Sequence, residues 1–246
     1  MTKLIMANLN QGFLADDGRV DNARLTNQAA ALAKQDTQLG FMTELPYAKL
    51  IQIFRGGPTS LNLICEGGAE TVINRVVRDE TAIDYDIWNA ALKWLQGERD
   101  FNTAYIVLSG KMNAYTDASE DSDAFKAFQA SYPSLYKMHS LSLVSDLVYQ
   151  IRLHFDSTDL QNRVQTFNSN FNGKLVAHAS GPDIWITAFD ASYQTAINNL
   201  TDDLDTPLDS VTVINAPAED DPIASVMGTP DDQDGYAAID KIIADD

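Results

Sequence analysis

Polar side chains end or follow three apolar, strand-like runs of this sequence. They are Asn8, Glu44, Lys111 and Asn113, at the runs 3–8, 39–42 and 104–109. The carboxylate of Glu44 offers the hard oxygen atoms that Mg²⁺ prefers, and Mg²⁺ needs only one or two protein carboxylates. Lys111 is a suitable partner for a phosphate group, although its ammonium cannot bind a cation while it is charged. Residues of these types could together hold a divalent cation and a phosphate group.

Five segments resemble, in order and spacing, the motifs of the endonuclease/exonuclease/phosphatase superfamily, which has the DNase I-like fold. They are Ile5–Gly12, Lys34–Leu45, Tyr105–Tyr115, Gly181–Thr187 and Ala218–Ala224. The third segment is similar to the family's strand followed by Gly-Asp-Phe-Asn, with Lys111 in the aspartate position and Asn113 kept. The resemblance covers most of the chain and implies the fold and the site of that family.

The resemblance also implies a role for particular residues. Glu44 falls on the magnesium-binding glutamate, while Asn8 and Asn113 take the positions that hold metal or phosphate. Asp183 falls on the aspartate that orients a catalytic histidine. In the closing motif, Glu219 replaces an aspartate and Asp220 replaces the histidine. The implied metal ligands are therefore Glu44 and Glu219, and the implied catalytic residues are Asn8, Lys111, Asn113, Asp183 and Asp220.

Three departures from the family pattern favour a degenerate hydrolytic centre. Lys111 replaces the turn aspartate, Asp220 replaces the closing histidine, and residues 72–84 contain no histidine. General acid–base help and charge stabilisation are each worth several kcal/mol, so their joint loss weakens phosphoester cleavage. The first hypothesis is a pseudoenzyme or a module that binds a phosphate ligand or a protein partner.

Two alternatives remain open. The first is a divergent, active Mg²⁺-dependent phosphodiesterase or phosphatase, whose acidic residues form a carboxylate-rich metal site while Lys111 stabilises developing charge. Mg²⁺ or Mn²⁺ is expected as a cofactor only in that case. The second is a plain α/β domain whose resemblances to the family are coincidental.

Strand-like and helix-like runs interleave along the 246 residues, which predicts one α/β (α+β) domain over residues 1–246. The resemblance implies a four-layered sandwich of two face-packed mixed β-sheets flanked by helices. Apolar spacing predicts helices at 21–34, 85–96, 121–130 and 140–153, and a short strand at 49–54.

The composition limits the partners. The net charge is −18, and the segment from about residue 201 carries 13 acidic residues against Lys241. Nucleic acid is disfavoured because such a surface repels it, which leaves a phosphorylated small molecule or a protein. Cys65 is alone, no apolar run reaches the roughly 18 residues of a membrane span, and the first residues do not resemble a secretory signal. A cytoplasmic location is therefore expected.

Overall fold

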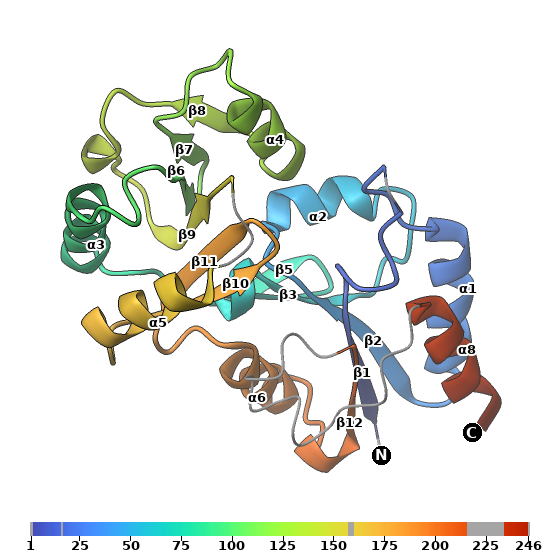
Figure 1. Ribbon diagram of the computed structural model, residues 1–246. Helices are drawn as coiled ribbons and strands as arrows, with labels where there is room; N and C mark the ends of the chain where they lie inside the picture. The colour runs from blue at the N-terminus through green and yellow to red at the C-terminus, as the bar shows by residue number, and fades with distance from the viewer. Residues whose placement is uncertain (1, 16, 157–159, 216–233, 246) are drawn as a thin grey trace. The chain divides into compact units, whose positions relative to one another are not determined.

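The computed structural model describes residues 2–15, 17–156, 160–215 and 234–245. The chain folds into two compact units, which Figure 1 shows and which are described separately. The first unit combines Met1–Glu80 with Tyr193–Asp246, and the second is Thr81–Ser192. The prediction of one domain over residues 1–246 concerns both units together and stays a prediction.

The first unit is built on a six-stranded mixed sheet in the order β12-β1-β2-β3-β4-β5. The strands are β1 (Lys3–Asn8), β2 (Thr37–Met42), β3 (Asn62–Cys65), β4 (Glu70–Ile73), β5 (Val76–Glu80) and β12 (Val211–Ile214). The four neighbours from β12 to β3 are parallel, and β4 and β5 add an antiparallel hairpin. The parallel strands are nearly continuous apolar runs because both faces of the sheet are covered.

Helices cover the two faces of this sheet. They are α1 (Asn22–Ala33), α2 (Tyr47–Ile53), α6 (Tyr193–Asp203) and α8 (Gly235–Asp245). In β1, Ile5 and Ala7 pack in the core that holds residues of α1, α2 and α8, whereas Leu4 and Met6 pack in the core that holds residues of α6. This alternation follows from the two-residue period of a strand. It fixes which face each helix covers.

The second unit holds the other six-stranded sheet, in the order β10-β11-β9-β6-β7-β8. Its strands are β6 (Tyr105–Gly110), β7 (Ala114–Thr116), β8 (Leu135–Lys137), β9 (Val148–His154), β10 (Leu175–Ser180) and β11 (Asp183–Ala188). Its helices are α3 (Tyr85–Gly97), α4 (Asp123–Ser131) and α5 (Gln161–Asn170). All strand pairs are antiparallel except β7 with β8. The main core of this unit contains Trp88 and Leu92 of α3, Phe167 of α5 and Ile151 of β9.

The α/β class is confirmed, with two mixed sheets flanked by helices, and the helices expected near 21–34, 85–96 and 121–130 are α1, α3 and α4. Two local predictions are wrong. Residues 49–54 lie mainly in helix α2, where Leu50 and Ile53 are buried one turn apart. Residues 140–153 form a short 3₁₀ turn and then strand β9, because β6 and β11 pair with β9 on both sides. No helix in the described ranges is long and apolar enough to cross a membrane.

Gly40 permits close packing inside the first sheet. A Cβ atom at this position would lie 2.5 Å from Met6 Sδ and 2.7 Å from the backbone oxygen of Asn62. We expect Gly40→Ala to lower the free energy of unfolding by about 1–3 kcal/mol, as overpacked cores do. Gly97→Ala is the control, because a Cβ there meets open space at the end of α3. Urea unfolding followed by circular dichroism checks this, and equal losses in both variants would contradict the packing explanation.

Candidate functional site

A polar cluster lies at the carboxyl ends of the parallel strands in the first unit. Strand β1 pairs with β2 and β12 in parallel, with Asn8 opposite Met42 and Ala7 opposite Ile214. The residues that follow these strands therefore meet at one edge of the sheet. In open α/β sheets, ligands bind at this edge. The residues that we call the strand-end site are Asn8, Asn10, Thr43, Glu44 and Asn215.

Asn10 joins the members of the strand-end site through hydrogen bonds. Its side-chain Nδ2 donates to Glu44 Oε2 at 2.5 Å, and its Oδ1 accepts from the Thr43 hydroxyl at 3.0 Å. Its backbone N–H donates to Asn8 Oδ1 at 3.0 Å. Asn8, Thr43 and Glu44 are buried, whereas Asn10 is exposed. The network thus connects three buried polar side chains to the exposed residue Asn10.

Two loops hold the strand-end site in place. In the turn after β3, the backbone N–H of Glu66 donates to the Leu45 backbone oxygen, and that of Gly67 donates to the Thr43 backbone oxygen. Each distance is 3.2 Å. Glu66 is buried and has a positive φ of 53°, which is uncommon for a residue with a side chain. Asn215 Nδ2 donates to the Gln11 oxygen at 3.1 Å and so fastens the loop after β1.

Four residues in or beside the site were not predicted from the sequence: Asn10, Thr43, Glu66 and Asn215. Thr43 directly precedes Glu44, and Asn10 lies two residues after Asn8, so spacing within each loop was the available signal. The run Glu66-Gly67-Gly68 after an apolar strand was a second signal, because two glycines permit a tight turn that returns to a site.

The donor set of this site is rich in amides and contains few carboxylates. Glu44 is its one acidic member, and within the described ranges no three His, Cys, Asp or Glu side chains gather as a metal cluster. The oxygen atoms of Glu44, Asn8 and Asn10 are nevertheless hard ligands, so they fit Mg²⁺ in kind. The amides and the Thr43 hydroxyl can donate hydrogen bonds to phosphate oxygens. The predicted residues Glu219 and Asp220 lie outside the described residues.

Cys65, at the end of β3, is a poor candidate for a nucleophile. Its side chain is fully buried, and burial raises the pKa of the thiol well above its usual value, with the nearby Glu70 and Glu66 adding to the rise. The thiolate is the reactive form of cysteine. Cys65 therefore belongs to the apolar core of the first unit.

Lys111 and Asn113 lie in the connection between β6 and β7 of the second unit. The Gly110 N–H donates to the Asn113 oxygen at 2.9 Å. Oδ2 of Asp146 accepts from the backbone N–H groups of Met112 and Asn113 at 3.0 and 3.3 Å, and from the Tyr115 hydroxyl at 3.0 Å. The carboxylate of Asp146 therefore holds the backbone of this turn in place.

Asp183 lies at the start of β11 in a buried ionic cluster of the second unit. Its two carboxylate oxygens contact Arg152 Nη2 and His154 Nδ1, each at 2.8 Å. The Arg152 guanidinium also lies over the rings of Phe128 and Trp185, at 5.2 and 4.7 Å from their centroids. Burial alone would lower the pKa of Arg152, but Tyr132 and Asp183 raise it above its ordinary value.

The predicted site residues therefore divide between the two units. Asn8 and Glu44 lie together in the strand-end site, whereas Lys111, Asn113 and Asp183 belong to the second unit. Glu219 and Asp220 are outside the described residues. That all seven residues form one centre stays a prediction.

The model of the haloacid dehalogenase-like hydrolases matches residues 9–215 of the chain. This chain belongs to that family. The match begins directly after β1 and ends directly after β12, and it includes every residue of the strand-end site except Asn8. A search of curated proteins finds no match.

Solved structures of haloacid dehalogenase-like and other bacterial proteins have the same fold. SMU.1108c from Streptococcus mutans UA159 has a TM-score of 0.85 at 16% identity, covering 99% of this chain and 100% of that one. A haloacid dehalogenase-like hydrolase from B. subtilis has a TM-score of 0.75 at 15% identity, covering 92% and 88%. BT1666 from Bacteroides thetaiotaomicron, described among phosphatases of the superfamily, has a TM-score of 0.74 at 15% identity, covering 99% and 96%.

The predicted membership of the endonuclease/exonuclease/phosphatase superfamily is wrong, and so is the first hypothesis of a degenerate DNase I-like protein. The family match and the similar structures identify a haloacid dehalogenase-like chain instead. The resemblance failed for a physical reason. A polar residue after a buried strand occurs wherever parallel strands end, and the turn at Lys111 is a hairpin connection held by Asp146. The alternative of a phosphatase agrees better with the family.

Proposed function

We propose that this haloacid dehalogenase-like protein binds a phosphorylated small molecule at the strand-end site and hydrolyses its phosphoester with the help of Mg²⁺. The observation that carries the proposal is the Asn10 network, which places amides, a hydroxyl and one carboxylate at the ends of parallel strands. Phosphatases of this superfamily typically use Mg²⁺. The net charge of −18 favours a small substrate over nucleic acid.

The residues of the site divide the work by their chemistry. The Asn10 amide and the Thr43 hydroxyl donate hydrogen bonds to phosphate oxygens, and Glu44 with the amide oxygen of Asn8 would hold Mg²⁺. When bound, Mg²⁺ supplies positive charge that offsets the charge of the phosphate. A carboxylate can act as a nucleophile, but an amide cannot. A water molecule therefore attacks phosphorus, and the ester oxygen leaves. The expected turnover is slow for that reason.

Glu44→Gln tests the proposed site. Phosphate release is measured from a panel of sugar phosphates, nucleoside monophosphates and p-nitrophenyl phosphate in millimolar Mg²⁺. We expect Glu44→Gln to lower the rate on the best substrate by about 10- to 100-fold, as the loss of a residue supporting a metal does. The change keeps the volume of the side chain and removes its charge.

Glu120→Gln is the matched control, because it removes the same charge from an exposed position in the second unit. It should keep the full rate. If no substrate in the panel releases phosphate, the proposed function is overturned. A Glu44→Gln variant with the wild-type rate would overturn the proposed site.

A further inference from the structure

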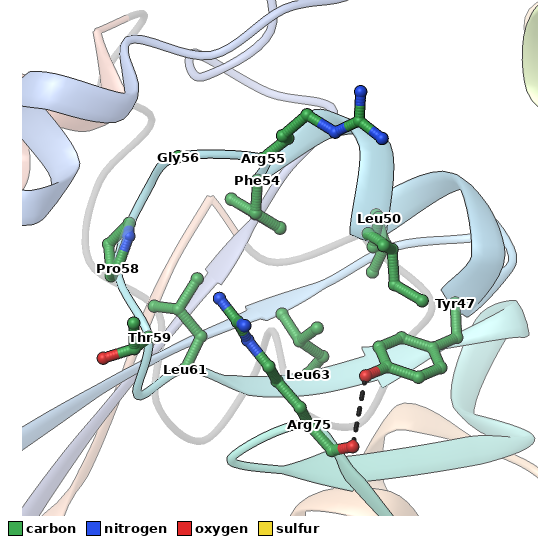
Figure 2. A pocket seen from close by; sticks show the side chains of 11 residues that line it. Tyr47, Leu50, Phe54, Arg55, Gly56, Pro58, Thr59, Leu61, Leu63 and Arg75 are labelled. Atoms are coloured by element: carbon green, nitrogen blue, oxygen red, sulfur yellow. Dashed lines mark hydrogen bonds between the residues drawn. The ribbon is translucent and has the colours of Figure 1, made fainter.

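A pocket of about 310 Å³ opens beside helix α2 in the first unit. The floor of the pocket is apolar. It is formed by Leu50 of α2, Phe54 directly after α2, Leu61 directly before β3 and Leu63 of β3. Figure 2 shows these side chains around the hollow. No residue of the strand-end site lines the pocket. Its volume is at the lower end of the range of small-molecule sites.

Arg75 brings a cation to this floor. Figure 2 shows its side chain running from the turn between β4 and β5 across the pocket, between Leu61 and Leu63. Tyr47 also lines the pocket, and its hydroxyl holds the turn by donating to the Arg75 backbone oxygen at 3.3 Å. A second cation, Arg55, stands at the rim with its guanidinium pointing away from the floor.

The backbone of Arg75 is held in a conformation that favours glycine. Asn74 and Arg75 form the two-residue connection of the β4–β5 hairpin, with φ values of 50° and 68°. Such turns prefer glycine at the second position because a side chain there is strained. Residues held in this way cluster at ligand sites, where the strain is part of the function.

The charge of Arg75 is not neutralised by a neighbour in the part of the chain that the structure describes. Neither Arg75 nor Arg55 forms an ion pair there, although Arg24 and Arg152 both do. Arg75 is exposed, and its guanidinium is therefore open to an acidic ligand. The planar guanidinium fork matches a carboxylate with two parallel hydrogen bonds.

We propose that this pocket binds a small organic carboxylate with an apolar body. The body lies on Leu50, Phe54, Leu61 and Leu63, and the carboxylate pairs with the Arg75 guanidinium. The strained turn is retained because it holds Arg75 over the floor. This second site is separate from the strand-end site and does not depend on the proposed hydrolysis.

Octanoate is the probe that tests the pocket, with methyl NMR of the protein as the readout. We expect saturable shifts of the Leu50, Leu61 and Leu63 methyl signals. Arg75→Gln should weaken binding about tenfold, the size of one charge-assisted bond. Arg78→Gln, in the same hairpin but outside the pocket lining, should leave the affinity unchanged. Acetate, which has no apolar body, should not shift these signals.

Arg75→Gly separates a role in binding from a role in folding. Glycine relieves the left-handed strain, so we expect the melting temperature to rise by about 2–4 °C while octanoate binding weakens about tenfold, as in Arg75→Gln. The proposal is overturned if octanoate shifts no pocket methyl signal at 10 mM, on the order of the weakest useful affinity. It is also overturned if octan-1-ol binds as tightly as octanoate, or if Arg75→Gln and Arg78→Gln weaken binding equally.

Discussion

Asn8→Asp should raise Mg²⁺-dependent phosphatase activity by about 10²-fold, the contribution typical of a carboxylate placed at a reacting group. The wild-type site has amides at Asn8 and Asn10, so it lacks an anionic oxygen at the end of β1. An aspartate has the same shape and still accepts the hydrogen bond that Asn8 Oδ1 receives from the Asn10 backbone. The new carboxylate adds a metal ligand and a nucleophile beside Glu44.

A second readout accompanies the gain in rate. Asn8 is only 5% exposed, so the new charge is costly to bury without a cation. We expect the Asn8→Asp variant to melt at a lower temperature than the wild type in a chelator and to regain stability with Mg²⁺. Asn198→Asp, which adds the same charge on the exposed side of α6, is the control and should do neither. An unchanged rate with unchanged Mg²⁺ dependence would argue against a phosphate site at the end of β1.

Asp183→Asn should lower the free energy of unfolding of the second unit by about 3–5 kcal/mol, because it leaves the buried Arg152 charge uncompensated. The side chains of Asp183 and Arg152 are each 10% exposed, and their contact is 2.8 Å. All three tryptophans, Trp88, Trp94 and Trp185, lie in this unit. Tryptophan fluorescence during urea unfolding therefore reports on the second unit alone.

The contribution of the buried pair to stability can be compared with that of an exposed ion pair in the same unit. Lys126 and Asp123 form an exposed ion pair on α4, so Lys126→Ala should cost at most about 0.5 kcal/mol. Combining Asp183→Asn with Arg152→Leu should recover much of the loss, since an apolar replacement of a buried pair is often neutral. A loss below 1 kcal/mol for Asp183→Asn, or no recovery in the double variant, would show that the pair is not a buried charge pair of the expected kind.

The spacing of apolar residues correctly predicted the elements whose structure depends on the local sequence. The helix expected at 21–34 is α1, which Asp21 caps by accepting from the Arg24 N–H at 2.9 Å; β1 ends at Asn8, and Glu44 follows β2 by two residues. Strand β9 was missed because its structure depends on β6 and β11, which lie far away in the sequence. Long-range pairing of this kind overrides a local helical pattern.

The candidate site was predicted only in part, for a similar reason. Asn8 and Glu44 were selected because each follows an apolar run, and both belong to the strand-end site. Asn10, which connects them, was missed because its spacing from Asn8 was the only local signal and its partners Thr43 and Glu44 lie more than thirty residues away. Lys111 and Asn113 were selected from a four-residue resemblance, and Asp146, which holds their turn, lies more than thirty residues away.

Side-chain amide NMR of the wild-type protein, titrated with inorganic phosphate in millimolar Mg²⁺, tests the strand-end site most directly, because phosphate is the product of every phosphatase. The account predicts saturable shifts of the Asn8 and Asn10 amide signals, while the amide of Asn22, which donates to the Ile53 oxygen, stays unchanged. Glu44→Gln should weaken these shifts. Unmoved Asn8 and Asn10 signals, with phosphate bound elsewhere or not at all, would contradict the account.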